Sequence, residues 1–379
     1  MLRSVYARRR ATAVGVVLLV GVAVWLALRD GNSSESKTTL PKLTLAQLAG
    51  QRVVVSFRAA GAGRIPSGLV KRIRAGTVGA VILFSENAHT VAGARRLTRK
   101  LQAIPRPAGL RAPLLVMVDQ EGGAIRRLTD APPRTNAEQM AATHDVDVIR
   151  ARGKATGQAL RRAGVNVDLA PVSDTPRKGS VLLAEKRTFG KVAADIGPDA
   201  AAFASGLVAG GAEATAKHFP GFGAATLNSD TSFVRIGLPA AMLRSVDEAP
   251  FRDVVKSGAR LVMLSNAIYP ALDRSAPATL SRSIATGELR GRLGFTGVSI
   301  TDDLQAVALR SFGGPGQIAV RGARAGDDLL LFGRTYKASV QAASALTAAL
   351  KSGKVGMAEA RAAATRVLAL RRSIASPLP

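Results

Sequence analysis

The chain has 379 residues, of which 47% are hydrophobic, so it is long and apolar enough to bury a large core. Its formal net charge is +27, it contains no Cys, and its three His are His89, His144 and His218. The lack of Cys excludes disulfides and thiolate metal sites, and so few His argue against a multi-His metal site. We expect neither a metal nor another cofactor.

The N-terminus combines a basic flank with an apolar run. Arg3 and the three arginines at 8–10 precede residues 11–28, which contain no charged side chain. This run reaches the lower limit for a membrane span, and the preceding cations favour a cytoplasmic N-terminus (1–10) with the rest exported. We predict an uncleaved transmembrane anchor over 11–28 and a flexible Ser- and Thr-rich linker over 29–41. A cleaved signal peptide, and hence a secreted protein, is the alternative.

The large positive charge is compatible with several kinds of partner. Basic surfaces attract nucleic acid, but aromatic residues make up only 4% of this chain and its Arg and Lys are scattered. Export would also separate the protein from nucleic acid, so we expect no such partner. Anionic envelope polymers or acidic lipids fit better. A solvated surface without a specific partner is the simplest alternative.

Apolar, β-branched runs alternate with amphipathic stretches along the rest of the chain. Eight runs predict strands: Arg52–Ser56, Ala80–Phe84, Leu114–Val118, Val165–Ala170, Ala214–Lys217, Leu261–Leu264, Val298–Thr301 and Leu329–Phe332. The stretches that predict helices are Ser67–Arg74, Val91–Leu101, Asp145–Arg162, Asp195–Val208, Ala240–Val255, Ser283–Leu293, Gln317–Arg324 and Ala338–Leu350.

This alternation indicates an α/β protein built from parallel βαβ units. A single (β/α)₈ barrel of the TIM type over residues 42–375 is the economical fold, with an additional C-terminal helix around Met357–Arg371. A doubly wound open sheet is the alternative. No glycine-rich dinucleotide fingerprint follows the first predicted strand, which argues against it.

Functional residues of a parallel barrel lie just after its strand ends. Polar residues follow five of the predicted strands: Asp119, Asp174, Lys217-His218, Asn266 and Asp302-Asp303. We therefore expect these side chains to meet at one mouth of the barrel and to form a site there.

The residue types at these positions indicate which chemistry the site can perform. A carboxylate at Asp302 can act as a nucleophile or stabilise positive charge, although Asp302 or Asp303 can instead cap the following helix. Asp119 precedes two glycines that permit a tight turn, which leaves its carboxylate free to accept hydrogen bonds from hydroxyls. Lys217 and His218 are donors, and Arg187 can join them. Carboxylates and cationic donors together suit a polyhydroxylated ligand.

Four motifs resemble those of family 3 glycoside hydrolases. They are Val-Asp-Gln-Glu-Gly-Gly at 118–123, Asn-Val-Asp-Leu-Ala-Pro-Val-Ser-Asp at 166–174, Lys-His-Phe-Pro-Gly at 217–221 and Thr-Asp-Asp-Leu at 301–304. The chain is most similar to the family's single-domain bacterial β-N-acetylhexosaminidases, which act on peptidoglycan-derived sugars. The similarity extends from about Thr44 to Arg371.

This resemblance implies a retaining glycosidase that hydrolyses O-glycosyl bonds, with Asp302 as the nucleophile. It also implies that substrate is bound by Asp119, Arg187, Lys217 and His218, and that Asp174 is a polar residue of the pocket wall. Retaining hydrolysis further requires a group that donates a proton and then recovers it.

The proton donor is where the chain departs from the family pattern. In the family, the loop after Lys-His-Phe-Pro-Gly continues His-Gly and ends Asp-Ser-His, whose His is the acid/base. Here the corresponding residues are Phe222-Gly223 and Asn228-Ser229-Asp230. A carboxylic acid is the usual donor in other glycosidases, so Asp230 is the provisional acid/base. Two further family residues are replaced: the Arg after Glu-Gly-Gly by Ala124, and the His after strand six by Asn266.

The sequence therefore supports two main hypotheses. The first is an extracytoplasmic, membrane-anchored glycosidase that cleaves β-linked N-acetylhexosamine from wall-derived sugars. The second is a catalytically impaired descendant of such an enzyme that binds glycan or an envelope partner. A binder of nucleic acid or another polyanion is a third hypothesis, which rests on charge alone.

Overall fold

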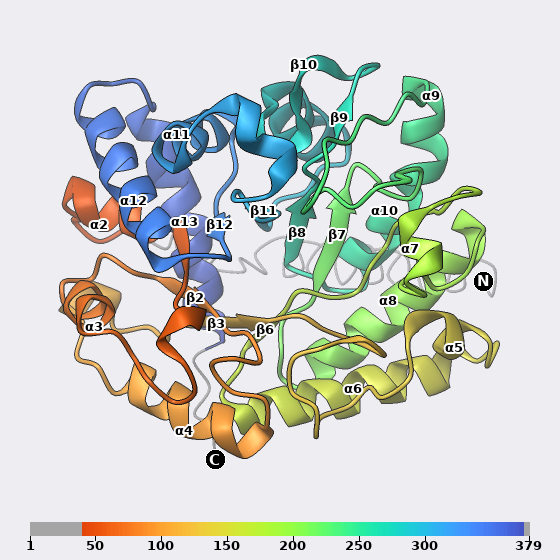
Figure 1. Cartoon of the computed structure of the whole chain (residues 1–379), viewed down its shortest axis with the longest axis horizontal. Coiled ribbons are helices and arrows are strands. Elements are labelled where there is room, and N and C mark those ends of the chain that lie inside the picture. Colours follow the sequence, from red (N-terminus) through yellow and green to blue (C-terminus); the bar gives the residue numbers. More distant parts are fainter. Residues whose placement is uncertain (1–39, 375–379) are drawn as a thin grey trace, which may run out of the picture. The chain divides into compact units, whose positions relative to one another are not determined.

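A computed structural model of the chain describes residues 40–374 (Figure 1). The predicted anchor at 11–28, its basic flank and the linker up to residue 39 lie outside the described residues. Within residues 40–374, no helix combines the length and the apolar character needed to cross a membrane.

Eight parallel strands form the centre of the described domain, and each overlaps one of the eight predicted runs. They are β1 (Val53–Ser56), β2 (Ala80–Ile82), β3 (Leu115–Val118), β6 (Val167–Asp168), β7 (Thr215–Phe219), β8 (Leu261–Leu264), β11 (Val298–Thr301) and β12 (Leu330–Phe332). Two small antiparallel hairpins were not predicted: β4 (Gln120–Gly122) with β5 (Ile125–Arg126), and β9 (Ile268–Tyr269) with β10 (Asp273–Pro277).

The eight strands pair in two parallel sheets, ordered β12-β1-β2-β3-β6 and β11-β8-β7. Isolated bridges connect the sheet edges: Val167 with Glu213 on one side, and Ile300 with Leu329 on the other. The expected continuous barrel ladder is therefore interrupted at two joints. One physical reason is the shortness of β6, which Pro171 follows closely; a proline has no N–H to donate to a ladder.

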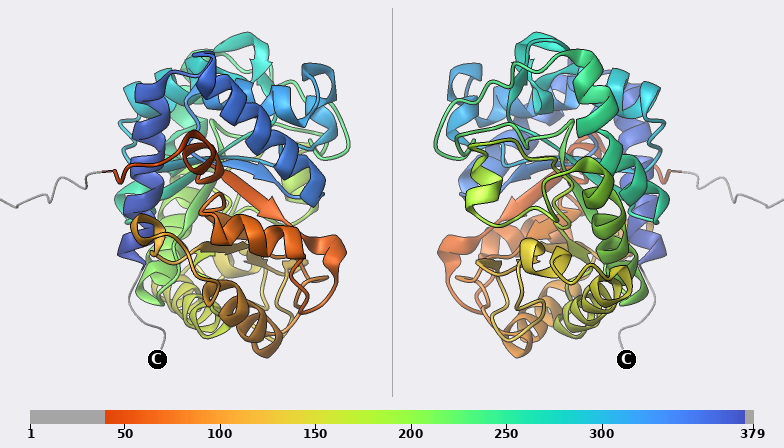
Figure 2. Two further views of the ribbon diagram at one scale, coloured as in Figure 1. Left: turned by 90° about the vertical axis from the view of Figure 1, so that its left-hand side faces the viewer. Right: turned by 90° about the vertical axis from the view of Figure 1, so that its right-hand side faces the viewer.

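The helices lie outside the strands, as Figure 1 and the side views of Figure 2 show. The longer ones are α3 (Ser67–Arg74), α4 (Val91–Gln102), α6 (Val146–Ala163), α8 (Ala193–Ala209), α10 (Ala249–Lys256), α11 (Pro315–Ala325), α12 (Tyr336–Lys351) and α13 (Met357–Ser373). Short helices are α2 (Leu45–Gly50), α5 (Ala137–Ala141), α7 (Val181–Ala184) and α9 (Ala240–Met242). Several begin at side-chain caps; Thr90, for example, accepts the N–H of Gly93.

Two predicted helices depart from regular α geometry. The stretch predicted at 240–255 divides into α9, a π-helical turn at Leu243–Asp247, and α10. Pro250 lies in the first turn of α10, where its missing N–H prevents the preceding turn from continuing as a regular helix. The predicted helix at 283–293 is π-helical over Ser283–Arg292.

Alternate residues of the strands form an apolar cluster to which both sheets contribute. It contains Val54, Ile82 and Met117 from the first sheet and Met263 and Ile300 from the second. Because residues two apart on a strand share a face, these side chains come from one face of each sheet. A larger cluster includes the opposite faces and the helices that cover them.

Helices α6 and α8 pack at short range because each presents glycines to the other. A Cβ on Gly153 would lie 2.3 Å from the backbone oxygen of Phe203, and one on Gly206 would lie 2.2 Å from that of Arg150. Any side chain at these positions would overlap the facing backbone, so the contact requires glycine on both helices.

The C-terminal helix is tied to early parts of the chain through Arg371. This side chain is fully buried, and its Nε donates to the backbone oxygen of Pro113 at 2.8 Å. Its two terminal nitrogens contact the side chain of Gln51 and the backbone oxygens of Leu110 and Ala112. Burial and nearby cations lower the pKa of Arg371 to about 9.

Candidate active site

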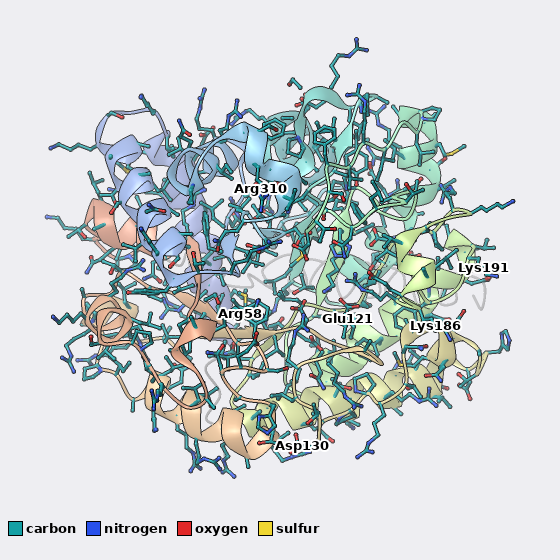
Figure 3. The ribbon with its side chains drawn as sticks, in the orientation of Figure 1. Arg58, Glu121, Asp130, Lys186, Lys191 and Arg310 are labelled. Carbon is teal, nitrogen blue, oxygen red and sulfur yellow. The ribbon has the colours of Figure 1, made fainter. Side chains whose placement is uncertain are left out.

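A cavity of about 940 Å³ lies among the loops that follow the carboxyl ends of the strands. Two of its lining residues, Arg58 and Glu121, are labelled near the middle of Figure 3. The polar and charged residues that line it are Arg58, Ser85, Glu86, Asp119, Glu121, Arg127, Glu185, Arg187, Lys217, His218, Asn228, Ser229, Asp230, Asp302, Asp303 and Arg334.

One wall of the cavity is a cluster of buried ion pairs. Lys217 Nζ lies 2.6 Å from Glu121 Oε1 and 3.0 Å from Asp119 Oδ1. Arg187 donates to both oxygens of Glu121 at 2.8 Å, through Nε and Nη2. Arg127 Nη2 lies 3.4 Å from Asp119 Oδ2. Segments far apart in sequence thus supply one network of acceptors and donors.

The network keeps its members charged. Burial alone would raise the pKa of Glu121, but Arg187 and Lys217 hold it well below its usual range. The pKa of Asp119 is likewise lowered, because Lys217 and Arg127 outweigh burial. Burial would lower the pKa of Lys217, but Glu121 and Asp119 raise it. Ionised carboxylates beside cationic donors are suited to binding several hydroxyls at once.

His218 is oriented by Asp174, which lies behind the cavity wall. Asp174 is fully buried, and its Oδ2 lies 2.8 Å from His218 Nδ1. It also accepts the backbone N–H of His218 at 3.1 Å and that of Phe222 at 2.6 Å. This contact assigns the proton to Nδ1 and turns the other edge of the ring away from Asp174.

Asp302 and Asp303, which follow β11, differ in their partners. The Oδ1 of Asp302 accepts the N–H of Asp303 at 2.7 Å, and Asp302 lines the cavity. The Oδ1 of Asp303 accepts the N–H of Gly333 at 2.9 Å and that of Gln305 at 3.1 Å. Asp303 therefore anchors loops, while the second oxygen of Asp302 has no protein partner among the described residues.

The environment of both carboxyls raises their pKa above that of an ordinary Asp. Burial raises the pKa of Asp302; His218 opposes this effect and Asp230 adds to it. Burial also raises the pKa of Asp303, to about 6. The cavity therefore holds a carboxyl at Asp302 that ionises less readily than an ordinary Asp.

The structure brings together six of the seven predicted site residues: Asp119, Arg187, Lys217, His218, Asp230 and Asp302 all line the cavity. Asp174, expected on the pocket wall, is instead enclosed behind His218. Asn266 was also expected at the mouth, but it is buried and donates to the backbone oxygen of Asp303 at 2.9 Å.

Among the cavity residues that sequence reasoning missed are Glu121, Arg127 and Arg334. Glu121 lies within the motif at 118–123 but had no assigned role. Arg334 follows β12, so the strand-end rule that identified Asp302 points to it as well. Within the part of the chain that the structure describes, no three Asp, Glu or His are grouped to hold a metal ion.

Comparison with known proteins identifies the family that the four sequence motifs resemble, and the match covers nearly the whole described domain. Residues 44–370 match the model of the glycosyl hydrolase family 3 N-terminal domain. An uncharacterized secreted glycosyl hydrolase of Arthroderma benhamiae is 35% identical over 340 residues, which are 88% of this chain and 95% of that protein.

Solved structures agree with this assignment. A family 3 β-N-acetylglucosaminidase from Paenibacillus superposes with a TM-score of 0.83 at 31% identity, over 89% of this chain and 64% of that one. The β-N-acetylhexosaminidase from Beutenbergia cavernae gives 0.78 at 31% identity, over 87% of this chain and 99% of that one. The described domain therefore has the α/β fold of these enzymes, and the chain belongs to glycosyl hydrolase family 3.

Proposed function

We propose that this protein is a retaining glycoside hydrolase that removes β-linked N-acetylhexosamine from cell-wall-derived sugars. The observation that carries the proposal is that Asp302 and Asp230 line one cavity together with the cluster of Asp119, Glu121 and Lys217. The activities named for the Paenibacillus and Beutenbergia relatives support the choice of sugar. We also infer that the two sheets act as one closed (β/α)₈ barrel, since bridges connect both pairs of edges.

In the proposed reaction, Asp302 attacks the anomeric carbon as the bond to the leaving oxygen breaks, and Asp230 gives that oxygen its proton. An ester between Asp302 and the sugar results. Asp230, now a carboxylate, removes a proton from water, which attacks the same carbon and releases Asp302. Two displacements retain the anomeric configuration. The network around Lys217 binds the sugar hydroxyls and keeps the ring in place for both steps.

An assay with two substrates tests this proposal. The protein is incubated with an activated aryl β-N-acetylglucosaminide and with a natural β-linked disaccharide, beside an Asp302→Ala variant. We expect turnover of both substrates by the wild type and a loss of at least about 10⁴-fold in the variant, because the nucleophile is gone. A variant as active as the wild type would rule out Asp302 as the nucleophile.

A catalytically impaired glycan-binding protein is the second candidate. It is favoured by the replacement of the family's proton-donating His with Asp230, whose side chain is 57% exposed. Calorimetric titration with N-acetylglucosamine distinguishes the two functions. Sugar binding without turnover of either substrate supports the second candidate and refutes the first.

We further propose that the protein is held at the cell membrane by residues 11–28, with its domain outside the cytoplasm. Four exposed cations on α4 (Arg95, Arg96, Arg99 and Lys100) suit contact with anionic envelope polymers or lipids; none of them is ion-paired with an acidic residue in the described chain. Retention in membranes after carbonate washing is expected, whereas release with a new N-terminus would indicate cleavage and secretion.

A further inference from the structure

Arg334 connects the proposed acid/base to the loop of the proposed nucleophile. It follows β12, and its Nη2 donates to Asp230 at two points: the side-chain Oδ1 at 3.1 Å and the backbone oxygen at 2.8 Å. Its Nε donates to Oδ2 of Asp303 at 3.3 Å. One guanidinium thus bridges the loops after β7, β11 and β12.

The backbone at Arg334 is itself held in place. Its backbone N–H and that of Thr335 both donate to Oε1 of Gln305, at 3.0 and 2.9 Å. The preceding Gly333 donates to Asp303. The segment that carries Arg334 is therefore attached to the loop after β11 through side-chain oxygens of that loop, and the guanidinium starts from a fixed position.

The backbone around Asp230 is fixed by other bonds, but its side chain is not. Val307 N donates to the backbone oxygen of Asp230 at 3.2 Å, and Ala308 N donates to that of Ser229 at 3.1 Å. These bonds attach the loop to the segment after β11. The Asp230 carboxylate is 57% exposed, and its only ion-pair partner among the described residues is Arg334. Without Arg334, nothing described would select one orientation of that carboxylate.

We propose that Arg334 is a positioning residue for proton transfer: its donation to Oδ1 of Asp230 fixes the direction of the carboxyl group, and Oδ2 is the oxygen that carries the proton to the departing oxygen and later takes one from water. This inference rests on the proposed function. A general acid contributes roughly 10²–10⁴-fold only when it is within hydrogen-bond reach of the departing oxygen, and the planar, rigid guanidinium fixes direction better than an ammonium does. An exposed Asp is short and free to rotate, so the direction comes from Arg334.

The test compares leaving groups across four proteins: wild type, Arg334→Gln, Asp230→Ala and the double variant. The leaving oxygen of an activated aryl glycoside departs with little help from an acid, whereas the sugar oxygen that leaves from the natural disaccharide must be protonated. We expect Arg334→Gln to lower kcat for the disaccharide about 10²-fold and kcat for the aryl glycoside less than about 5-fold. We expect KM to change little, because the sugar network is elsewhere in the cavity.

The double variant distinguishes positioning from a structural role. If Arg334 acts through Asp230, the double variant is no slower than Asp230→Ala alone, whereas independent effects would multiply. Arg334→Lys should recover part of the loss. Arg310→Gln removes the same charge from an exposed residue on the 3₁₀ helix Val307–Phe312, outside the cavity lining (Figure 3), and should match the wild type.

Three results would overturn the inference even if the protein is a glycosidase. Equal losses on both substrates would indicate a structural defect, and multiplied losses in the double variant would show that Arg334 acts independently of Asp230. An Asp230→Ala variant with full disaccharide activity would show that the proton comes from elsewhere, while Asp302→Ala still reports on the glycosidase itself. If the wild type hydrolyses neither substrate, the proposed function fails and this inference fails with it.

Discussion

His218 Nδ1 lies 2.8 Å from Oδ2 of Asp174, and the same carboxylate also accepts two backbone N–H groups of the segment 218–222. A residue that does not reach the cavity thus fixes both the ring of His218 and the loop that follows it. The strand-end pattern placed Asp174 in the cavity, whereas it lies behind the cavity wall and orients His218, which lines the cavity.

Replacing Asp174 with Asn should reduce catalysis while leaving the set of residues that line the cavity unchanged. The amide nitrogen cannot accept an N–H, so at least one charge-assisted bond worth about 1.5–3 kcal/mol is lost. We expect kcat/KM for the aryl glycoside to fall about 10- to 100-fold. Asp195→Asn, an exposed change on α8, is the control. Unchanged kinetics in Asp174→Asn would show that the orientation of His218 does not matter to the reaction.

The pH dependence of kcat/KM should reflect the environment of Asp302. Burial raises its pKa, and a nucleophile must be ionised, so activity is lost as pH falls through this raised value. The acid limb with the aryl glycoside should therefore lie above about 3.9, the ordinary value for Asp. His218→Ala should move the limb to still higher pH, because His218 lowers the pKa of Asp302. A limb at the ordinary value would contradict this assignment.

Replacing a glycine in the contact between α6 and α8 by a residue with a side chain should destabilise the fold. A Cβ on Gly157 would lie 2.3 Å from the backbone oxygen of Leu207, so the helices must separate to admit it. We expect Gly157→Ala to lower the free energy of unfolding by about 1–3 kcal/mol, measured by urea denaturation. Gly287→Ala is the matched control: a methyl group added there would have no neighbouring atom within 4 Å, so the change should be neutral or slightly stabilising.

Asp168 should make the folded protein less stable as pH rises. It is fully buried in β6; its Oδ1 accepts the N–H of Gln120 at 2.9 Å, and its Oδ2 has no partner among the described residues. Burial raises its pKa to about 8, so the folded chain retains a proton that the unfolded chain loses near pH 4. Stability from this group is therefore present at low pH and is lost as pH rises toward 8.

The variant Asp168→Asn cannot ionise and should remove this pH dependence. Between about pH 5 and pH 9 its Tm should fall less than that of the wild type. The Tm of the variant minus that of the wild type should therefore increase as pH rises. Parallel Tm curves would show that Asp168 has no raised pKa in the folded protein.

Much of the architecture could be predicted because its signals are local. The run at 261–264 is apolar at every position, and β8 has the predicted bounds. The stretch 67–74 likewise became α3 with the predicted bounds. The π-helical turn at Leu243–Asp247 was not foreseen, because the prediction treated 240–255 as one helix and gave no weight to the missing N–H of Pro250.

The site was predicted less completely, because its contacts join distant segments. Strand-end position alone identified Asp302, but it could not separate Asp119, which reaches the cavity, from Asp174, which does not. The pairing of Arg187 with Glu121 and that of Arg334 with Asp230 leave no local pattern in the sequence. Such partners become visible only when the fold brings the strand ends together.

The place of β1 between β12 and β2 has a consequence for biosynthesis. Val53 pairs with Leu330, and Arg371 then contacts the side chain of Gln51. One edge of the first strand must therefore remain unpaired while almost all of the chain is being translated. The domain cannot complete its fold during synthesis, and an exported chain would reach the far side of a membrane with that last pairing still to be made.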